Sequence, residues 1–345
     1  MSKVLITGGA GFIGFHLTKR LLAEGYEIIS IDNMNEYYSI DLKYDRLKQY
    51  GVTKDITYNV PVSPIANYSF IKLDITDRDN LHKLFDKEQF DFVINLAAQA
   101  GVRYSIENPY TYEKNNIDGF LNVLEGCRNT KVKHLLYASS SSVYGLNSQI
   151  PFKESHATEH PISLYAASKK ANEMMAHTYS YLYGIPTSGL RFFTVYGPWG
   201  RPDMALFLFT KAMLEDKAID VFNHGEMLRD FTYVEDIVDG ITKLIPHTPK
   251  GISKEVLPSD QSTAPYSIYN IGNGSPVPLM DFVHEIEKNI GCKAKINFKP
   301  LQPGDVPKTY ADTSKLENAV GYKSKTSVPE GIKNFYNWYK EYFLN

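Results

Sequence analysis

The sequence predicts an α/β fold in which a doubly wound parallel sheet is followed by a smaller C-terminal α/β domain. An apolar run, a glycine-rich turn and an amphipathic segment open the chain within residues 4–22. Apolar runs and amphipathic segments then alternate as far as residue 193, as strands separated by helices do. Beyond that point the elements shorten, and Pro and Gly become more frequent. We therefore assign residues 1–193, rejoined by a segment near 234–250, to the first domain and residues 194–345 to the second.

The glycine-rich turn is the most informative motif of the chain. Its letters are TGGAGFIG, at residues 7–14, between a short strand and a helix. Gly8 permits a tight turn, Gly11 lets a pyrophosphate approach the backbone, and Gly14 lets helix and strand pack closely. Phosphates would bind at the amide-rich start of the helix, next to Phe12 and Ile13. The motif in this context predicts a Rossmann-type dinucleotide site.

The residue that ends the second apolar run indicates which dinucleotide binds. That run covers residues 28–31 and is followed by Asp32. A carboxylate at this point accepts hydrogen bonds from the adenosine ribose hydroxyls and repels a 2′-phosphate. The sequence therefore predicts NAD, rather than NADP, as the cofactor.

The elements after Asp32 follow in order. Residues 33–67 are a polar, tyrosine-rich insertion with no clear strand, in which 42–50 form a short helix with Lys43, Arg46 and Lys48 as solvated charges. Small residues at 97–101 directly follow a strand, which lets a flat cofactor lie against the backbone. Periodicity and stop signals assign the remaining strands to 69–73, 92–96, 134–138, 187–193 and 266–271, and the helices to 78–86, 110–128, 164–183, 207–214, 234–245, 279–290 and 329–343.

Composition excludes several classes of protein. The net charge of -2 provides no basic field for nucleic acid or an anionic membrane. No apolar run reaches the roughly 18 residues that a membrane span needs. Cys127 and Cys292 are far apart, which fits neither a metal site nor a disulfide framework, and no secretory segment precedes the first strand. We expect a cytoplasmic protein with no metal and with neither a nucleic-acid nor a membrane partner.

A serine cluster and a tyrosine–lysine pair predict catalysis. The letters SSSSVYG at 139–145 come just past the carboxyl end of a strand, where open α/β sheets build their sites. Tyr165 and Lys169 are four residues apart on a helix and share a face. Lys169 and a nicotinamide cation would lower the tyrosine pKa from about 10 toward neutrality, with Ser140 bonded to the same substrate hydroxyl. Such pairs occur by chance in many helices, but the dinucleotide motif favours a catalytic one here.

At these motifs the chain resembles the extended short-chain dehydrogenase/reductase family, specifically its nucleotide-sugar 4-epimerases. The resemblance covers nearly the whole length. The glycine turn, Asp74-Ile75, the letters NLAA at 95–98, the serine cluster and the Tyr165/Lys169 pair all fit in order. The segment RFFTVYGPWGRPDMA at 191–205 is most similar to the UDP-glucuronate 4-epimerases of this family.

This resemblance implies a mechanism, a homodimer and a set of site residues. The tyrosine removes the proton of the C4 hydroxyl of a UDP-sugar while hydride passes from C4 to NAD+; the 4-keto sugar then rotates and takes the hydride back on its other face. The dimer would form through helices 110–128 and 164–183. The implied cofactor-binding residues are Gly8, Gly11, Phe12, Ile13, Asp32, Asn33, Asp74, Ile75, Leu96, Ala97, Ala98, Asn115, Tyr165 and Lys169, and the substrate-binding residues are Ser141, Ser142, Thr194, Arg201, Arg229, Gln302 and Asp305.

Departures from related enzymes narrow the reaction. Dehydratases and decarboxylases of this family carry acidic side chains where this chain has Ser141 and Ser142, and serine cannot act as a carboxylate base. Thr194 stands where UDP-glucose/galactose epimerases usually carry Asn. Arg201 could offer a charge-assisted fork to a uronate carboxylate. A salt bridge to Asp203 and a phosphate contact are the alternative roles of that arginine.

Three further positions leave the identity of the UDP-sugar undecided. Arg229 matches a family position that contacts the diphosphate, with an inter-domain ion pair as the alternative. Gln302 replaces a second family arginine, and the small Thr309 could admit a C2 N-acetyl group. A UDP-glucose/galactose or UDP-N-acetylhexosamine 4-epimerase and a non-catalytic NAD-binding scaffold are therefore the alternatives to a uronate epimerase.

Overall fold

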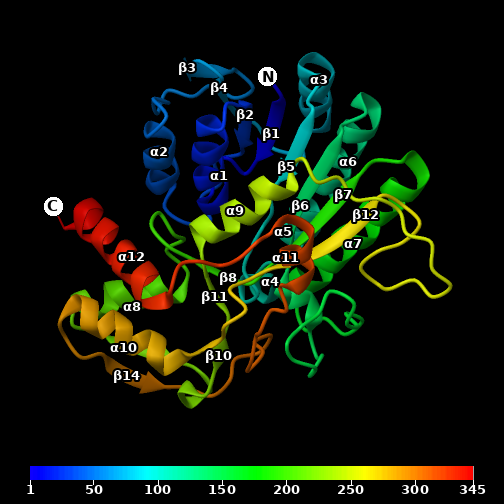
Figure 1. Cartoon of the computed structure of the whole chain (residues 1–345). Helices are drawn as coiled ribbons and strands as arrows, with labels where there is room; N and C mark the ends of the chain where they lie inside the picture. Colours follow the sequence, from blue (N-terminus) through cyan, green and yellow to red (C-terminus); the bar gives the residue numbers. More distant parts are fainter. Residues whose placement is uncertain (345) are drawn as a thin grey trace.

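The computed structural model describes residues 1–344 and is built around an eight-stranded sheet (Figure 1). The strand order is β12-β7-β6-β5-β1-β2-β4-β3, parallel except for the antiparallel edge pair β3–β4. This arrangement confirms the predicted fold class. The strands are β1 (Lys3–Thr7), β2 (Glu27–Asp32), β3 (Val62–Ile65), β4 (Tyr68–Lys72), β5 (Phe92–Asn95), β6 (His134–Ser140), β7 (Thr187–Phe192) and β12 (Tyr266–Ile271).

The sheet changes winding direction beside β1. From β1 the chain adds β2 and β4 on one side, then crosses back to β5 and adds β6, β7 and β12 on the other. Thr7 lies in register with Ile31 on β2 and with Asn95 on β5. Ligands of open α/β sheets bind in the crevice outside the carboxyl ends of the strands at such a point. The fold therefore places the site next to the glycine turn.

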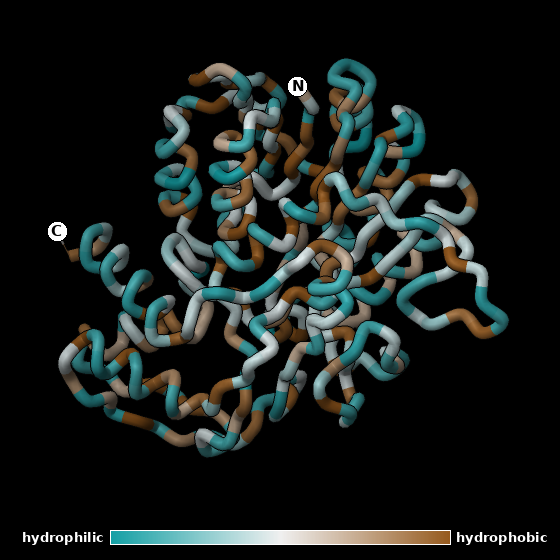
Figure 2. Tube along the Cα trace, viewed as in Figure 1, coloured by the Kyte–Doolittle hydropathy of each residue, from teal (hydrophilic) through white to brown (hydrophobic). Residues whose placement is uncertain are grey.

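Helices cover both faces of the sheet and bury two apolar cores. One core includes Leu17, Leu21 and Ile241 from helices on one face, and the other includes Phe85 and Val123 from helices on the opposite face. In Figure 2 the central strands are largely apolar, whereas the helices carry hydrophilic stretches on their outer sides. The first face holds α1 (Phe12–Ala23), α2 (Ile40–Lys48), α9 (Val234–Leu244) and α11 (Ser314–Val320), and the second holds α3 (Arg78–Glu88), α6 (Gly119–Thr130) and α7 (Leu164–Tyr183).

A third core belongs to the second half of the chain. Phe207, Phe231, Phe282 and Phe335 lie in it, and the rings of Phe231 and Phe282 stack 3.8 Å apart. This unit lies beyond the carboxyl ends of the central strands (Figure 1). Its helices are α8 (Ala205–Leu214), α10 (Leu279–Ile290) and α12 (Val328–Phe343), and its short strand pairs are β8 (Thr194–Tyr196) with β11 (Phe231–Tyr233), β9 (Ala218–Val221) with β14 (Lys295–Phe298), and β10 (Leu228–Arg229) with β13 (Val277–Pro278).

Three elements differ from the sequence prediction. The insertion contains the edge strand β3, whose Pro64 donates no backbone hydrogen bond and masked the strand signal. Strand β12 was assigned from sequence to the second domain, but it extends the central sheet beside β7. The sequence did not predict this because the alternation of side chains in a strand does not reveal which strand it pairs with. The segment predicted as one helix over 110–128 is divided into the short α5 (Tyr110–Tyr112), a π-helical turn (Glu113–Asp118) and α6. A further short helix, α4 (Tyr104–Glu107), precedes this segment.

Two of the charges predicted to be solvated on α2 are instead buried. Lys43 and Arg46 are 4% and 0% exposed, whereas Lys48 is exposed as predicted. Lys43 Nζ lies 3.3 Å from Asp32 Oδ1, and the Arg46 guanidinium donates to the carbonyl of Ala10. The prediction was wrong because lysine and arginine side chains on a helix normally face solvent. Here segments that are distant in the sequence supply buried partners for both side chains.

Candidate active site

The glycine turn has the geometry that its motif predicts. Gly8 has φ +74°, and a Cβ atom there would lie 2.9 Å from the backbone nitrogen of Ala97. A Cβ at Gly14 would lie 2.2 Å from the Gly8 carbonyl oxygen, so the first turn of α1 could not pack against the loop. Thr7 Oγ1 joins this turn to the neighbouring strand by donating to Asn95 and accepting from the Ala97 amide. The turn therefore leaves open the space that a pyrophosphate requires.

The Asp32 carboxylate lies at the end of β2 beside a buried lysine. Asp32 is 7% exposed, and its Oδ1 accepts from the Met34 amide and from Lys43 Nζ. Lys43 Nζ also donates to Asn35 Oδ1 at 3.1 Å. One oxygen of the Asp32 carboxylate is thus engaged by protein donors. Asp32, Asn33 and Lys43 all line the same cavity.

One cavity of about 1040 Å³ brings the predicted site residues together. It runs from the glycine turn and Asp32, past the serine cluster, to the wall formed by the second half of the chain. Its volume suits a large ligand pair rather than one small molecule, since single-ligand pockets usually span about 300–1,000 Å³. The predicted residues that line it are Gly8, Gly11, Phe12, Ile13, Asp32, Asn33, Ile75, Leu96, Ala97, Ala98, Asn115, Ser140, Ser141, Ser142, Tyr165, Lys169, Thr194, Arg201, Arg229 and Asp305.

Two predicted residues lie outside this cavity. Asp74 uses one carboxylate oxygen to accept from Asn33 Nδ2 at 2.9 Å and the other to accept from Thr76. It therefore holds the Asn33 side chain and does not line the cavity itself. Gln302 is half-buried, and its Oε1 has no hydrogen-bond partner among residues 1–344. Direct contact of either residue with a ligand stays a prediction.

Ser140, Tyr165 and Lys169 converge on the cavity from two elements. Ser140 ends β6, so two of the serines belong to the strand rather than following it. Tyr165 and Lys169 start α7, where Ser163 caps the helix by accepting from the Ala166 amide. Lys169 Nζ donates to the Ala138 carbonyl at 3.0 Å. The tyrosine hydroxyl, the serine hydroxyl and the ammonium group thus share one face of the cavity.

Burial sets the pKa values of this pair. It lowers the pKa of Lys169 to about 8, which still leaves the ammonium charged at neutral pH. It also raises the pKa of Tyr165 above its usual value, and a hydrogen bond with Ser140 and the charge of Arg201 oppose that rise only in part. Desolvation therefore dominates the pKa of Tyr165 in the protein alone, and the lowering by Lys169 together with a nicotinamide cation stays a prediction.

A buried ion pair supports the serine cluster from behind. The Arg191 guanidinium donates to both oxygens of Glu173, from Nε at 2.8 Å and from NH2 at 2.9 Å. Glu173 Oε1 also accepts from Ser139 Oγ at 2.7 Å. The side chain of Ser140 accepts from the Ser142 amide at 3.1 Å. Glu173 of α7 and Arg191 of β7 therefore hold Ser139, whereas the hydrogen bond between Ser140 and Ser142 is local to the cluster.

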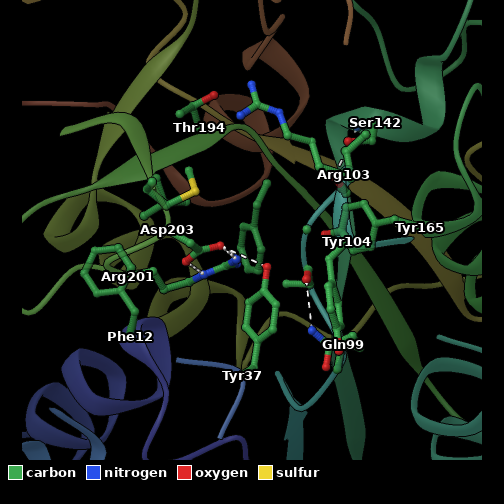
Figure 3. Close-up of a pocket in the computed structure, with 18 of the residues that line it drawn as sticks. Phe12, Tyr37, Gln99, Arg103, Tyr104, Ser142, Tyr165, Thr194, Arg201 and Asp203 are labelled. Carbon is green, nitrogen blue, oxygen red and sulfur yellow. Dashed lines mark hydrogen bonds and ion pairs between the residues drawn. The ribbon is translucent and has the colours of Figure 1, made fainter. Parts of the chain in front are cut away.

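Arg201 projects into the cavity and is already paired (Figure 3). Its Nε and NH2 lie 3.0 and 2.5 Å from the two carboxylate oxygens of Asp203. Tyr37 donates from its hydroxyl to the same carboxylate at 3.2 Å, and its ring packs against Tyr104 with centroids 4.9 Å apart. The salt bridge to Asp203, one of the alternative roles, is therefore present.

The wall opposite the serines carries two further arginines. Arg229 donates to the carbonyls of Leu228 and Pro307 and pairs with no carboxylate within residues 1–344, so the predicted alternative of an inter-domain ion pair is wrong. Burial lowers its pKa to about 10. Arg103 pairs with Asp305 at 3.3 Å and stacks on the Phe222 ring.

Several cavity residues escaped the sequence reasoning. Tyr37 and Lys43 lie in the insertion at 33–67, for which no site role was predicted, although the density of tyrosines there was a usable signal. Gln99 is held by Asn116, which accepts from the Gln99 amide and donates to its carbonyl. The π-helical turn that carries Asn116 had no sequence signal. Others that were missed include Arg103, Tyr104 and Phe222.

The comparisons with known proteins bear on this site directly. Residues 4–272 match the family model described as the NAD dependent epimerase/dehydratase family. The chain belongs to this family. That assignment confirms the resemblance found in the sequence.

Individual members of the epimerase/dehydratase family match along their length. The chain is 54% identical to protein CapI of Staphylococcus aureus, with 99% of both chains covered. It is 44% identical to UDP-glucuronate 4-epimerase 2 of Arabidopsis thaliana, covering 99% of this chain and 76% of that protein. The UDP-glucuronic acid 4-epimerase of Bacillus cereus, solved with UDP-glucuronic acid and NAD, superposes with a TM-score of 0.85 at 32% identity, covering 99% and 100%.

No helix within residues 1–344 is long and apolar enough to cross a membrane. Within the same residues, no group of three or more His, Cys, Asp and Glu side chains is arranged to hold a metal ion.

Proposed function

We propose that this protein is an isomerase that interconverts UDP-glucuronate and UDP-galacturonate by NAD-dependent epimerisation at C4. The observation that carries the proposal is the single cavity that joins the glycine turn and Asp32 to Ser140, Tyr165 and Lys169. The relatives support the same substrate, since both the Arabidopsis protein and the Bacillus cereus structure are named for glucuronate epimerisation.

The residues present fit NAD. The open cradle at Gly8 and Gly14 would receive the pyrophosphate, and Asp32, with Lys43 beside it, would receive the adenosine ribose. Leu96, Ala97 and Ala98 would lie along the nicotinamide half. When bound, NAD+ supplies the hydride acceptor for C4 and returns the hydride, so no net redox change results.

Tyr165 is the group that moves the proton. It would take the C4 hydroxyl proton and give it back after the sugar turns over, with Ser140 bonded to the same oxygen. Burial raises the tyrosine pKa, so the phenolate needs nearby positive charge, which Lys169 and a bound nicotinamide cation supply. Lys169 reaches this position because the Ala138 carbonyl orients its ammonium group.

Ser141, Thr194 and Arg201 would hold the uronate carboxylate. A 4-keto uronate is a β-keto acid and loses CO2 readily when the breaking bond aligns with the carbonyl. A hydrogen-bonded carboxylate kept out of that alignment stays attached, and Ser141 and Ser142 provide no acid to assist another outcome. Arg229 would hold the diphosphate, because its half-buried charge has no carboxylate partner among the described residues.

A second candidate substrate is a neutral UDP-hexose or UDP-N-acetylhexosamine. The observation that favours it is the pairing of Arg201 with Asp203, which occupies two of the donors that a uronate would use. The small Thr309 also lines the cavity. Arg201→Ala separates the two cases: a true clamp predicts about a tenfold or greater loss of kcat/KM on UDP-glucuronate and a much smaller loss on UDP-galactose. Equal losses on both sugars would argue against the clamp.

We also propose a homodimer in a reducing, cytoplasmic setting. Met174 and Tyr181 on α7 are 63% and 65% exposed, and Leu182 beside them and Leu121 on α6 are exposed as well. Such an apolar surface on two packed helices supports self-association. The free cysteines, Cys127 and Cys292, support the location. Light scattering tests the dimer, and a single species of 39.1 kDa would contradict it.

The decisive experiment is incubation of the purified protein with UDP-glucuronate, without added oxidant, followed by NMR of the products. UDP-galacturonate without UDP-pentose or net NADH is the expected result. A UDP-pentose would mean that the argument from Ser141 and Ser142 is wrong. Turnover of UDP-galactose or UDP-N-acetylglucosamine alone would establish the second candidate, and no turnover of any of these sugars would favour a non-catalytic scaffold.

A further inference from the structure

Arg46 is a fully buried cation that the proposed mechanism does not use. It is 0% exposed, it does not line the cavity, and none of the ion pairs within residues 1–344 includes it. A buried charge without a counterion is costly unless hydrogen bonds compensate it. The positions of its hydrogen-bond acceptors therefore indicate what it does.

The Arg46 guanidinium joins two segments that are far apart in sequence. NH1 donates to the Ala10 carbonyl at 2.9 Å and to the Tyr38 hydroxyl at 2.8 Å. NH2 donates to the Trp199 carbonyl at 2.7 Å. Ala10 belongs to the glycine turn, and Trp199 belongs to the turn that leads to Arg201. One side chain thus connects the dinucleotide loop to the segment that carries the proposed substrate arginine.

The turn at Trp199 depends on outside support. Trp199 has φ +60°, which is strained for a bulky residue and persists only where the surroundings hold it. Its ring packs against Phe15 of α1 at 5.5 Å and against Trp338 and Tyr342 of α12 at 5.3 and 5.1 Å. The carbonyl of this strained residue is the one that Arg46 holds, two residues before Arg201.

We propose that Arg46 is a positioning residue that couples dinucleotide binding to nucleotide-sugar binding. The proposal rests on the assignment of the glycine turn to NAD and of Arg201 to the sugar nucleotide. A ligand that fixes the glycine turn fixes the Ala10 carbonyl, and through Arg46 it fixes the turn before Arg201. Coupling between two ligands is reciprocal, so each ligand strengthens the binding of the other.

The planar shape of the Arg46 guanidinium, and not its charge alone, connects Ala10 to Trp199. A guanidinium has five donors in a rigid plane and can serve three acceptors in different directions, whereas an ammonium is a compact point charge on a flexible stem. Arg46→Lys keeps the charge but cannot span Ala10 and Trp199 together. A merely structural role predicts a loss of stability with no change in coupling, so the coupling itself must be measured.

The test measures UDP binding by calorimetry with and without saturating NAD+, in the wild type, Arg46→Lys and Arg20→Lys. Arg20 is an exposed arginine on α1, which makes Arg20→Lys the matched control. We expect NAD+ to tighten UDP binding about tenfold in the wild type and the control, and to have almost no effect in Arg46→Lys. A wild-type ratio near one, or an unchanged ratio in Arg46→Lys, would overturn the proposal.

Intrinsic fluorescence gives a second readout that needs no variant. The chain has two tryptophans, Trp199 and Trp338, and both lie at this junction. Their emission should change on addition of either NAD+ or UDP to the wild type, and constant emission under saturation by both would contradict the coupling even if Arg46→Lys does not fold. Neither readout requires turnover, so coupled binding without conversion of UDP-glucuronate would refute the proposed reaction and leave this inference standing.

Discussion

The wall behind the serine cluster and the wall opposite it bury arginine in different ways. Arg191, behind the cluster, is 0% exposed and makes a two-point pair with Glu173, which raises its pKa well above the usual value. Arg229, on the opposite wall, donates to two backbone carbonyls and to the sulfur of Met227 but to no carboxylate among the described residues, and burial lowers its pKa to about 10. Arg191, which has its counterion in place, supports the scaffold, whereas Arg229 lines the cavity as a desolvated charge without a carboxylate partner among the described residues, which suits contact with an anionic ligand.

The largest expected effect comes from a residue between these two walls. Tyr165→Phe removes the proposed proton acceptor while keeping the ring, so kcat should fall by about 10²–10⁴-fold. The KM for UDP-glucuronate and the melting temperature should change little. Steady-state kinetics and a thermal melt check this, and a variant with more than a tenth of wild-type kcat would remove Tyr165 from the proton transfer.

Breaking the Arg191 pair tests the scaffold side of the comparison. Glu173→Gln leaves the arginine charge buried and uncompensated, which should lower the free energy of unfolding by about 3–5 kcal/mol. Denaturant unfolding measures this. The matched control is Glu24→Gln, which removes an exposed partner of Arg20 and should cost about 0.2–1 kcal/mol. Similar losses of unfolding free energy in the two variants would mean that the buried pair stabilises the fold no more than an exposed pair does.

Removing Arg229 tests the ligand side. Arg229→Met should raise the KM for the UDP-sugar about 10–100-fold, because a charge-assisted hydrogen bond contributes roughly 1.5–3 kcal/mol. Stability should be unchanged or slightly higher, because the variant no longer buries an unpaired charge. Arg128→Met, at an exposed arginine, is the control for substitution alone. A large loss of stability with unchanged KM would place Arg229 with Arg191 in the scaffold.

The smallest expected effect is a pH dependence. Burial lowers the pKa of Lys169 to about 8, so its positive charge is present below that pH and is lost as the pH rises through it. Since that charge favours the Tyr165 phenolate, kcat/KM should decline on the alkaline side, and Lys169→Met should lack this limb at a lower overall rate. A wild-type profile that stays flat to pH 10 would contradict the role of the ammonium.

Residues that are close in sequence carried most of the predictions that the structure brings together in one cavity. The glycine turn, the acid that ends β2, and the tyrosine–lysine pair each depend on neighbours within one or two elements, so their spacing is readable without the fold. Asp74 and Gln302 fared differently. Asp74 matches the family pattern but holds Asn33 in place. Gln302, which stands where the family has an arginine, lies outside the cavity, and both outcomes depend on contacts that no local pattern encodes.

The sequence by itself therefore determined the class of fold, the dinucleotide motif, the spacing of the tyrosine–lysine pair and the family. It did so because periodicity and short spacings are properties of adjacent residues. Only the tertiary structure decided that Lys43 and Arg46 are buried, that Arg229 lacks a counterion among the described residues, and that burial raises the pKa of Tyr165. Burial and electrostatics depend on what packs against a side chain from elsewhere in the chain. Those neighbours exist only once the protein has folded.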